Sequence, residues 1–181
     1  MTLPERARKR RASWRGDSMD ERDFEPTWAD LLQAVGQGAA HPSGDQRATL
    51  LAYWDRAPVA AYAKRCVIAH YLADLHSDPL DALRWNLAAL DAYSGVRRDD
   101  LASIGIDDAT SFEPSLHLNV GNDYFMLGRF AEAAQHARAA MTAQDQPAAS
   151  SPLAAMIARG AIRLRERADQ ALQQRRELTG E

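Results

Sequence analysis

The chain has 181 residues, a formal net charge of −3 and 46% hydrophobic residues, a balance typical of one folded domain with a sizeable core. No apolar run approaches the ~18–20 residues that cross a bilayer, and no apolar segment follows the basic N-terminal patch as in a secretory signal. The single cysteine, Cys66, excludes an internal disulfide and is typical of a reducing compartment. We therefore expect a cytoplasmic protein without a membrane partner.

Residues 1–24 differ in composition from the rest of the chain. The first eighteen carry six basic and two acidic residues, a net charge of +4, so the remainder sums to −7. A basic arm could contact nucleic acid or an acidic membrane surface. The segment is short, however, and Trp14 is the one aromatic residue in its first eighteen. We interpret residues 1–24 as a disordered arm, with Met19 as an alternative start, and expect no nucleic-acid partner.

Two helices are expected after this arm. Thr27 is a favourable N-cap, and the apolar residues after it predict a short helix that ends near Gly36. Residues 37–44 are rich in Gly, His, Pro and Ser, which indicates a linker. A second helix should begin at Asp45 and stop before Pro58. Together they could form an incomplete first pair in a row of helix pairs.

The next two helices have stronger signals. Apolar residues spaced three and four apart predict a helical run over Val59–His76. Asp78 suits an N-cap before Pro79 at the first helical position, so another helix should begin there and end near Gly95. Its apolar side comprises Ala82, Leu83, Leu87, Leu90 and Tyr93. We expect the two helices to pack as a pair.

The connector over residues 94–113 is longer than a simple turn between helix pairs. Leu101, Ile104 and Ile106 predict an extra half-helix over residues 99–106 that packs against its neighbours. Long connectors in compact domains are often functional or mobile. The alternative, which we favour, is a packed loop without a function of its own.

The stretch Pro114–Met141 is the most regular part of the chain. Its first apolar stripe predicts a helix that ends before Gly128, since glycine tolerates the positive φ found just past a helix end. Gly121 has no side chain to hold a neighbouring backbone away. The two stripes are Leu116, Val120, Tyr124 and Leu127, and then Phe130, Ala133, Ala134, Ala137 and Ala140. The small residues of the second stripe should let the paired helices approach closely.

This order of small, aromatic and glycine residues resembles the tetratricopeptide repeat (TPR), a helix–turn–helix unit of about 34 residues. The resemblance assigns repeat packing to Gly121, Tyr124, Gly128, Phe130, Ala133 and Ala140. His117 and Ala137 depart from the family's preferences, and residues 59–95 would form a more degenerate unit. The chain is also similar to uncharacterised bacterial repeat proteins. The resemblance implies an all-α fold, a short TPR-like α-solenoid of antiparallel helix pairs.

The last predicted helix opens at Ser151, with Pro152 at its first position. One apolar stripe and a charged remainder predict a C-terminal capping helix over Pro152–Leu172, which would cover the last apolar face of the row. A basic amphipathic helix for membrane or partner contact is the alternative, weakened by its acidic residues. We therefore expect the TPR-like domain to span residues 25–176, with a disordered tail over 177–181.

A catalytic or metal site has little support in the sequence. Cys66, His70 and Asp74 lie four residues apart on one helix face and could align a thiolate, an imidazole and a carboxylate. Among apolar neighbours, Cys66 and His70 are better explained as core residues. His117 also takes a packing position, where we expect its ring to bond a backbone carbonyl. No phosphate loop, nucleophile elbow or HExxH motif occurs, so we expect no enzyme activity, metal or cofactor.

The TPR resemblance also implies where a partner would bind. In TPR proteins the first helix of each unit lines a concave groove, and the matching positions are Ser115, Leu118, Asn119, Asn122, Phe125 and Met126. Asn119 and Asn122 match positions that grip a peptide backbone in some members, because asparagine both donates and accepts hydrogen bonds. Leu118 replaces the lysine that a carboxylate clamp needs. Alternatively, all six side chains pack against the connector or the capping helix.

Three classes of function follow from this interpretation. A scaffold or adaptor that binds a protein or peptide in the groove is favoured, because Phe125 and Met126 would offer an apolar patch for docking. A regulatory or accessory domain that self-associates into a homo-oligomer comes second. A metal-binding or enzymatic protein comes third.

Overall fold

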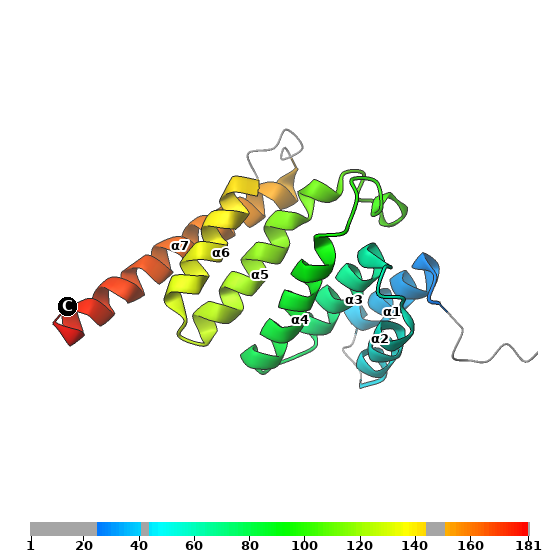
Figure 1. Cartoon of the computed structure of the whole chain (residues 1–181), viewed down its shortest axis with the longest axis horizontal. Helices are drawn as coiled ribbons and strands as arrows, with labels where there is room; N and C mark the ends of the chain where they lie inside the picture. The colour runs from blue at the N-terminus through cyan, green and yellow to red at the C-terminus, as the bar shows by residue number, and fades with distance from the viewer. Residues whose placement is uncertain (1–24, 41–43, 144–150, 181) are drawn as a thin grey trace, which may run out of the picture.

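A computed structural model describes residues 25–40, 44–143 and 151–180, so the predicted arm over residues 1–24 lies outside the described part. That part is all-helical, as predicted, with seven α-helices and no strand. The helices follow one another in chain order along the molecule, from α1 near one end to α7 at the other (Figure 1). None of the described helices is both long and apolar enough to cross a bilayer.

The first helix, α1 (Trp28–Ala40), begins with a reciprocal capping box. The Thr27 hydroxyl accepts a hydrogen bond of 3.2 Å from the Asp30 amide, and the Asp30 carboxylate accepts one of 2.8 Å from the Thr27 amide. The predicted end near Gly36 is wrong, because α1 continues to Ala40. Gly36 keeps a helical backbone, and the alanines that follow favour the helix.

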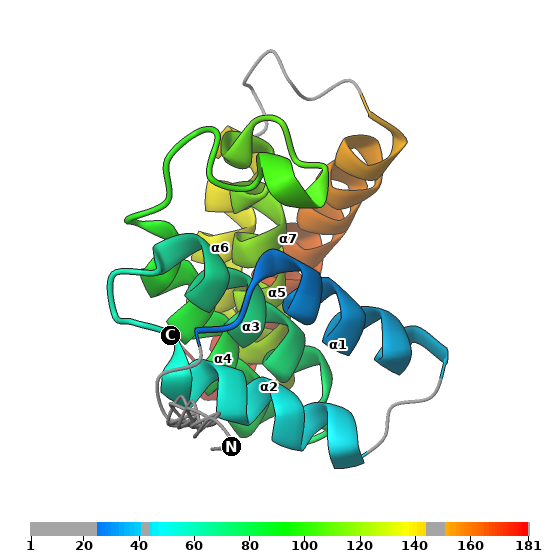
Figure 2. The same ribbon diagram turned by 90° about the vertical axis from the view of Figure 1, so that its right-hand side faces the viewer.

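The second helix, α2 (Gly44–Arg56), stops before Pro58 as predicted. Only residues 41–43 separate it from α1, so most of the predicted linker is helical. Both helices pack against α3 (Tyr62–Asp74) (Figure 2). The buried side chains of this contact are Leu31, Ala34, Leu50, Ala57, Ile68 and Leu72. The first helix pair therefore shares its core with α3.

The fourth helix, α4 (Pro79–Tyr93), packs along α3. Its predicted start is confirmed, since the Asp78 carboxylate accepts a hydrogen bond of 2.8 Å from the amide of Leu80. The helix also ends close to Gly95, as predicted. Gly95 is required for a close contact, because a Cβ there would lie 2.5 Å from the ring of Tyr62.

The connector after α4 is a packed loop. In place of the predicted half-helix over residues 99–106 it contains two short 3₁₀ helices, η2 (Ala102–Ile104) and η3 (Ala109–Ser111). Leu101 is completely buried and clusters with Val67 of α3 and with Ala109. The amide of Ala109 donates a hydrogen bond of 2.8 Å to the carbonyl of Arg98, which closes the loop.

The stretch that carries the TPR resemblance folds into α5 (Glu113–Met126) and α6 (Phe130–Ala143), which pack closely together. Gly128 between them has a φ of 70°, the positive value predicted for this turn. Of the residues matched to repeat packing, the buried ones are Gly121, Ala133 and Ala140, and the half-buried ones are Tyr124, Gly128 and Phe130. The small residues therefore lie where two helices meet.

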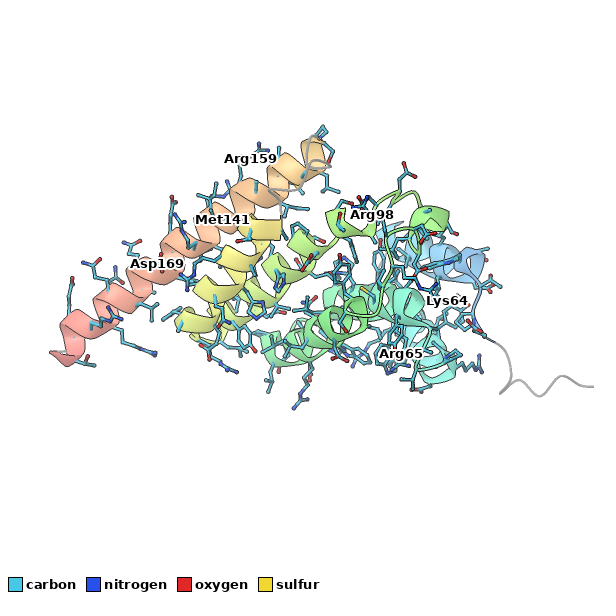
Figure 3. All side chains as sticks on the ribbon, turned by 45° about the horizontal axis from the view of Figure 1, so that its top comes forward. Lys64, Arg65, Arg98, Met141, Arg159 and Asp169 are labelled. Carbon is cyan, nitrogen blue, oxygen red and sulfur yellow. The ribbon has the colours of Figure 1, made fainter. Side chains whose placement is uncertain are left out.

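The last helix, α7 (Pro152–Thr179), packs against both α5 and α6. It begins as predicted, with the Ser151 hydroxyl accepting a hydrogen bond of 3.1 Å from the Ala154 amide. Its buried stripe is Ile157, Ala161, Leu164 and Ala168, while Arg159 and Asp169 are exposed along it (Figure 3). The predicted end at Leu172 and the disordered tail from 177 are wrong, because the helix continues to Thr179. The Gln, Arg and Glu residues of this extension favour a helix without a packing partner.

Candidate functional site

A small polar pocket opens between α3, α4 and α5, three helices that lie side by side in Figure 1. It has a volume of about 220 Å³ and is lined by Ala73, Asp74, His76, Ala82, Asn86, Asn119, Asn122 and Asp123. This lining offers two carboxylates, three side-chain amides and one imidazole. None of the described residues that line it is a lysine or an arginine. We refer to this site below as the polar pocket.

Asn86 is the most deeply buried polar side chain of the polar pocket, with 4% of its surface exposed. Its Nδ2 donates a hydrogen bond of 2.7 Å to Oδ2 of Asp123, which joins α4 to α5. Its Oδ1 has no hydrogen-bond partner in the described part of the chain. A buried polar atom without a partner costs on the order of 1–3 kcal/mol. Asn86 therefore leaves one buried acceptor unsatisfied at the lining of the pocket.

Asp123 carries a carboxylate whose charge is unfavourable in the free protein. Partial burial raises its pKa, the hydrogen bond from Asn86 lowers it, and the charge of Asp74 raises it. The net shift is upward, which means that the folded protein disfavours the ionised form relative to an ordinary aspartate. A cation bound in the pocket would reduce the repulsion between the carboxylates of Asp74 and Asp123.

His76 brings an imidazole to the polar pocket. Its side chain is 7% exposed, and Nε2 has no hydrogen-bond partner among the described residues. The other ring nitrogen, Nδ1, lies 3.9 Å from Oδ2 of Asp81.

Two of the six predicted groove residues belong to the polar pocket. Asn119 lies with its Nδ2 3.5 Å from Nδ1 of His70, so its amide is held against α3. Asn122 is exposed at the edge of the pocket. The structure thus brings together the two asparagines that the resemblance assigned to peptide binding.

The other four predicted groove residues lie elsewhere. Leu118 contacts α7, since a Cβ on Gly160 would lie 2.9 Å from its Cδ2. Phe125 packs at a tilt against Phe130, with ring centres 5.2 Å apart, and the Arg167 guanidinium of α7 lies 4.3 Å from the ring centre of Phe125. Leu118 and Phe125 therefore lie against α7, as in the alternative interpretation of the sequence, in which these side chains pack within the fold.

Ser115 and Met126 occupy the two ends of α5. The Ser115 hydroxyl donates a hydrogen bond of 2.7 Å to the carbonyl of Phe112, so it closes the start of the helix. Met126 is 69% exposed at the opposite end. Of these two, only Met126 offers a surface to a partner.

The line of Cys66, His70 and Asp74 lacks the properties of an activated thiol. Cys66 is completely buried, and burial raises the pKa of its thiol to about 12, so the thiolate is strongly disfavoured. Burial also lowers the pKa of His70, with the charge of Asp74 acting in the opposite direction. In the described ranges no three His, Cys, Asp or Glu residues are grouped as metal ligands.

Comparison with known proteins adds no relative. No protein-family model matches the chain, and neither a curated protein nor a solved structure matches it. The TPR resemblance therefore depends on the residues that carry it, and the function has to be inferred from the chemistry of the site.

Sequence reasoning missed Asn86, His76 and Asp123 as site residues. Asn86 had a detectable signal, because it follows Ala82 by four residues and precedes Ala89 by three, on a helix face that is otherwise buried and apolar. A polar residue at such a position needs a partner or a ligand. The partner, Asp123, is 37 residues away and could be found only after α4 and α5 were placed together.

Proposed function

We propose that this chain is a protein- or peptide-binding module that acts as a scaffold or adaptor. In this proposal α3 and α4 form one TPR-like unit and α5 and α6 the next, in a short α-solenoid closed by α7. The packing of each helix on its chain neighbour supports the arrangement. The polar pocket is the observation that carries the function, because it lies between α3 and α5, the first helices of the two units.

The chemistry of the polar pocket suits an extended polypeptide. The amides of Asn119 and Asn122 each provide donors and an acceptor, which match the alternating N–H and C=O groups of a peptide backbone. The three side-chain amides of the lining are hydrogen-bonding groups without nucleophilic character, which supports binding as the role of the pocket.

The test is a selection of ligands from a displayed random-peptide library, followed by affinity measurements on purified protein. We expect selected peptides to bind the Asn119→Ala/Asn122→Ala variant at least about tenfold more weakly, the effect of losing one or two hydrogen bonds. The matched control replaces two exposed amides on other helices, Gln135→Ala/Gln170→Ala, and should bind like the wild type. Thermal unfolding of each variant verifies that it is folded.

Two outcomes contradict the proposal. One is that peptides selected on the wild type bind both double variants equally well. The other is that no peptide is enriched on the wild type beyond its enrichment on the asparagine variant.

Self-association is the second candidate, favoured by apolar side chains at the start of α7. Leu153 and Met156 are 60% and 55% exposed, an unusual position for large apolar residues three apart on one helix. If they form a dimer contact, light scattering should give the mass of two chains, and Leu153→Glu/Met156→Glu should give the mass of one. A monomeric wild type at high concentration would eliminate this candidate.

A further inference from the structure

The residues described as lining the polar pocket include two carboxylates and neither a lysine nor an arginine. Asn86 Oδ1 is a buried acceptor without a partner in the described part of the chain, and the carboxylates of Asp74 and Asp123 line the same space. We propose that the polar pocket receives the guanidinium group of an arginine side chain from the bound polypeptide. This inference rests on the proposed binding function and specifies the chemistry of one contact within it.

The unpartnered acceptor of Asn86 favours a ligand that donates hydrogen bonds. Asn86 donates from Nδ2 to Asp123, and its Oδ1 is the atom without a partner in the described part of the chain. An acceptor that is hydrogen-bonded to water in the unfolded chain loses this hydrogen bond on burial. Only a new donor group can replace it. Arginine is a donor alone, with no acceptor atom in its head group.

The charge of the lining also favours a ligand that is positively charged. The basic residue next along α4, Arg84, donates to the Asp81 carboxylate at 3.0 Å and does not line the pocket. The two carboxylates therefore line the pocket without a cation among the described lining residues. A cation bound between them would offset both the burial and the mutual repulsion that raise the pKa of Asp123.

The geometry favours guanidinium over ammonium. The amide and carboxylate oxygens of the lining lie on three helices, so one donor group has to point in several directions at once. A guanidinium presents five N–H groups in a fixed plane and can bind a carboxylate through two of them while the others reach further acceptors. An ammonium has three donors and holds its water more strongly. The volume of about 220 Å³ is several times the ~30 Å³ share of one water, so the group fits.

The experiment is a titration of the full isotope-labelled chain with capped Gly-Arg-Gly, followed by nuclear magnetic resonance. We expect saturable shifts of the side-chain amide signals of Asn86, Asn119 and Asn122. The citrulline peptide, which has nearly the same shape without the charge, should bind at least about tenfold more weakly, because the charge-assisted hydrogen bonds are lost. The lysine peptide should also bind more weakly than the arginine peptide.

Variants of the pocket test the same contact from the protein side. Asp123→Asn keeps an oxygen for the hydrogen bond from Asn86 and should weaken arginine binding about tenfold, while it raises the urea midpoint at neutral pH by removing a disfavoured charge. Asp74→Asn is a second variant at an exposed position and should also weaken binding. Asp169→Asn, on the exposed face of α7, is the matched control and should bind like the wild type.

The outcomes separate this inference from the proposed function. Absence of saturable shifts with the arginine peptide, or equal affinity for the citrulline or lysine peptide, overturns the arginine contact. If library peptides bind through Asn119 and Asn122 but are insensitive to Asp123→Asn and Asp74→Asn, the inference fails and the binding function stands. If no library peptide binds, the proposed function fails, and the arginine contact, which rests on it, fails with it.

Discussion

The Nδ1 atoms of His117 and His136 lie 3.0 Å apart between α5 and α6. At this distance one ring donates and the other accepts, so the pair holds one hydrogen between two neutral rings and repels a second proton. The bond replaces the predicted bond of His117 to a backbone carbonyl. Burial lowers the pKa of both rings, and the charge of a protonated His117 lowers that of His136 further, to about 4.

This pair predicts a loss of stability in mild acid. The pKa of His136 is about 4 in the folded chain and about 6.5 for an ordinary histidine, so the unfolded chain takes up the proton first as the pH falls. The stabilisation is complete above about pH 6.5 and is lost as the pH falls toward 4. Because the ring is about half exposed, we expect the free energy of unfolding to drop by about 1–2 kcal/mol. Urea unfolding across this pH range measures it.

The variant His136→Asn provides the control for this prediction. It keeps a polar side chain at the position but removes the titrating group, so its stability should fall less steeply with acid. The remaining titrating groups, including His70 and the carboxylates, are the same in both proteins. Equal slopes for variant and wild type would exclude the histidine pair as the cause.

Two glycines in helices should respond in opposite directions to alanine. Gly121→Ala would place a Cβ 2.7 Å from Cδ2 of Leu164 and 3.2 Å from Cβ of His136, so the Leu164 side chain and the neighbouring part of α6 must move, at a cost of about 1–3 kcal/mol. Gly36→Ala meets nothing within 4 Å on α1 and should stabilise the protein by about 0.5–1 kcal/mol. Chemical unfolding of the two variants side by side tests the packing of α7 on α5. Equal effects at the two positions would show that α5 and α7 do not meet there.

Cys66 should be protected from thiol reagents in the folded chain. Its side chain is completely buried and its pKa is raised to about 12, so reaction requires unfolding of the region around α3. At mildly alkaline pH we expect labelling at least about 10³-fold slower in buffer than in denaturant. As a control, Ala131→Cys in a Cys66→Ala background puts the thiol on an exposed position of α6, where labelling should be fast without denaturant. Rapid labelling of native wild type would contradict the placement of α3.

The connector should contribute to stability through one side chain. Leu101→Ala removes a completely buried side chain that packs on Val67 and Ala109, which we expect to cost about 2–4 kcal/mol. Leu178→Ala, at a position 88% exposed, should change stability by less than about 0.5 kcal/mol. A small effect at Leu101 would mean that the connector moves freely.

The local signals of the sequence predicted several helix boundaries correctly. Asp78 and Ser151 cap their helices through side-chain hydrogen bonds, and Gly128 takes the positive φ expected of it. These features depend on residues only two to four positions apart, so they can be predicted from the sequence alone. The predicted end of α1 near Gly36 was wrong, because a glycine can also lie within a helix when its neighbours favour one.

Only some of the residues of the candidate site could be predicted from the sequence. Asn119 and Asn122 were predicted to bind a partner from the TPR resemblance, and both line the polar pocket. Asn86 and Asp123 were not predicted, since their hydrogen bond joins residues 37 positions apart. Leu118 was expected in a groove, but the approach of Gly160 in α7 gives it a packing role.

The all-helical class, most of the caps and turns that begin and end the helices, and their apolar stripes could be predicted from the amino-acid sequence alone. Which polar side chains meet between helices, and which side of α5 is covered by α7, became known with the three-dimensional fold. The difference lies in the range of the interactions, because caps, turns and stripes arise from neighbours within one or two helical turns. Contacts such as His117 with His136, or Asn86 with Asp123, depend on how whole helices pack against each other.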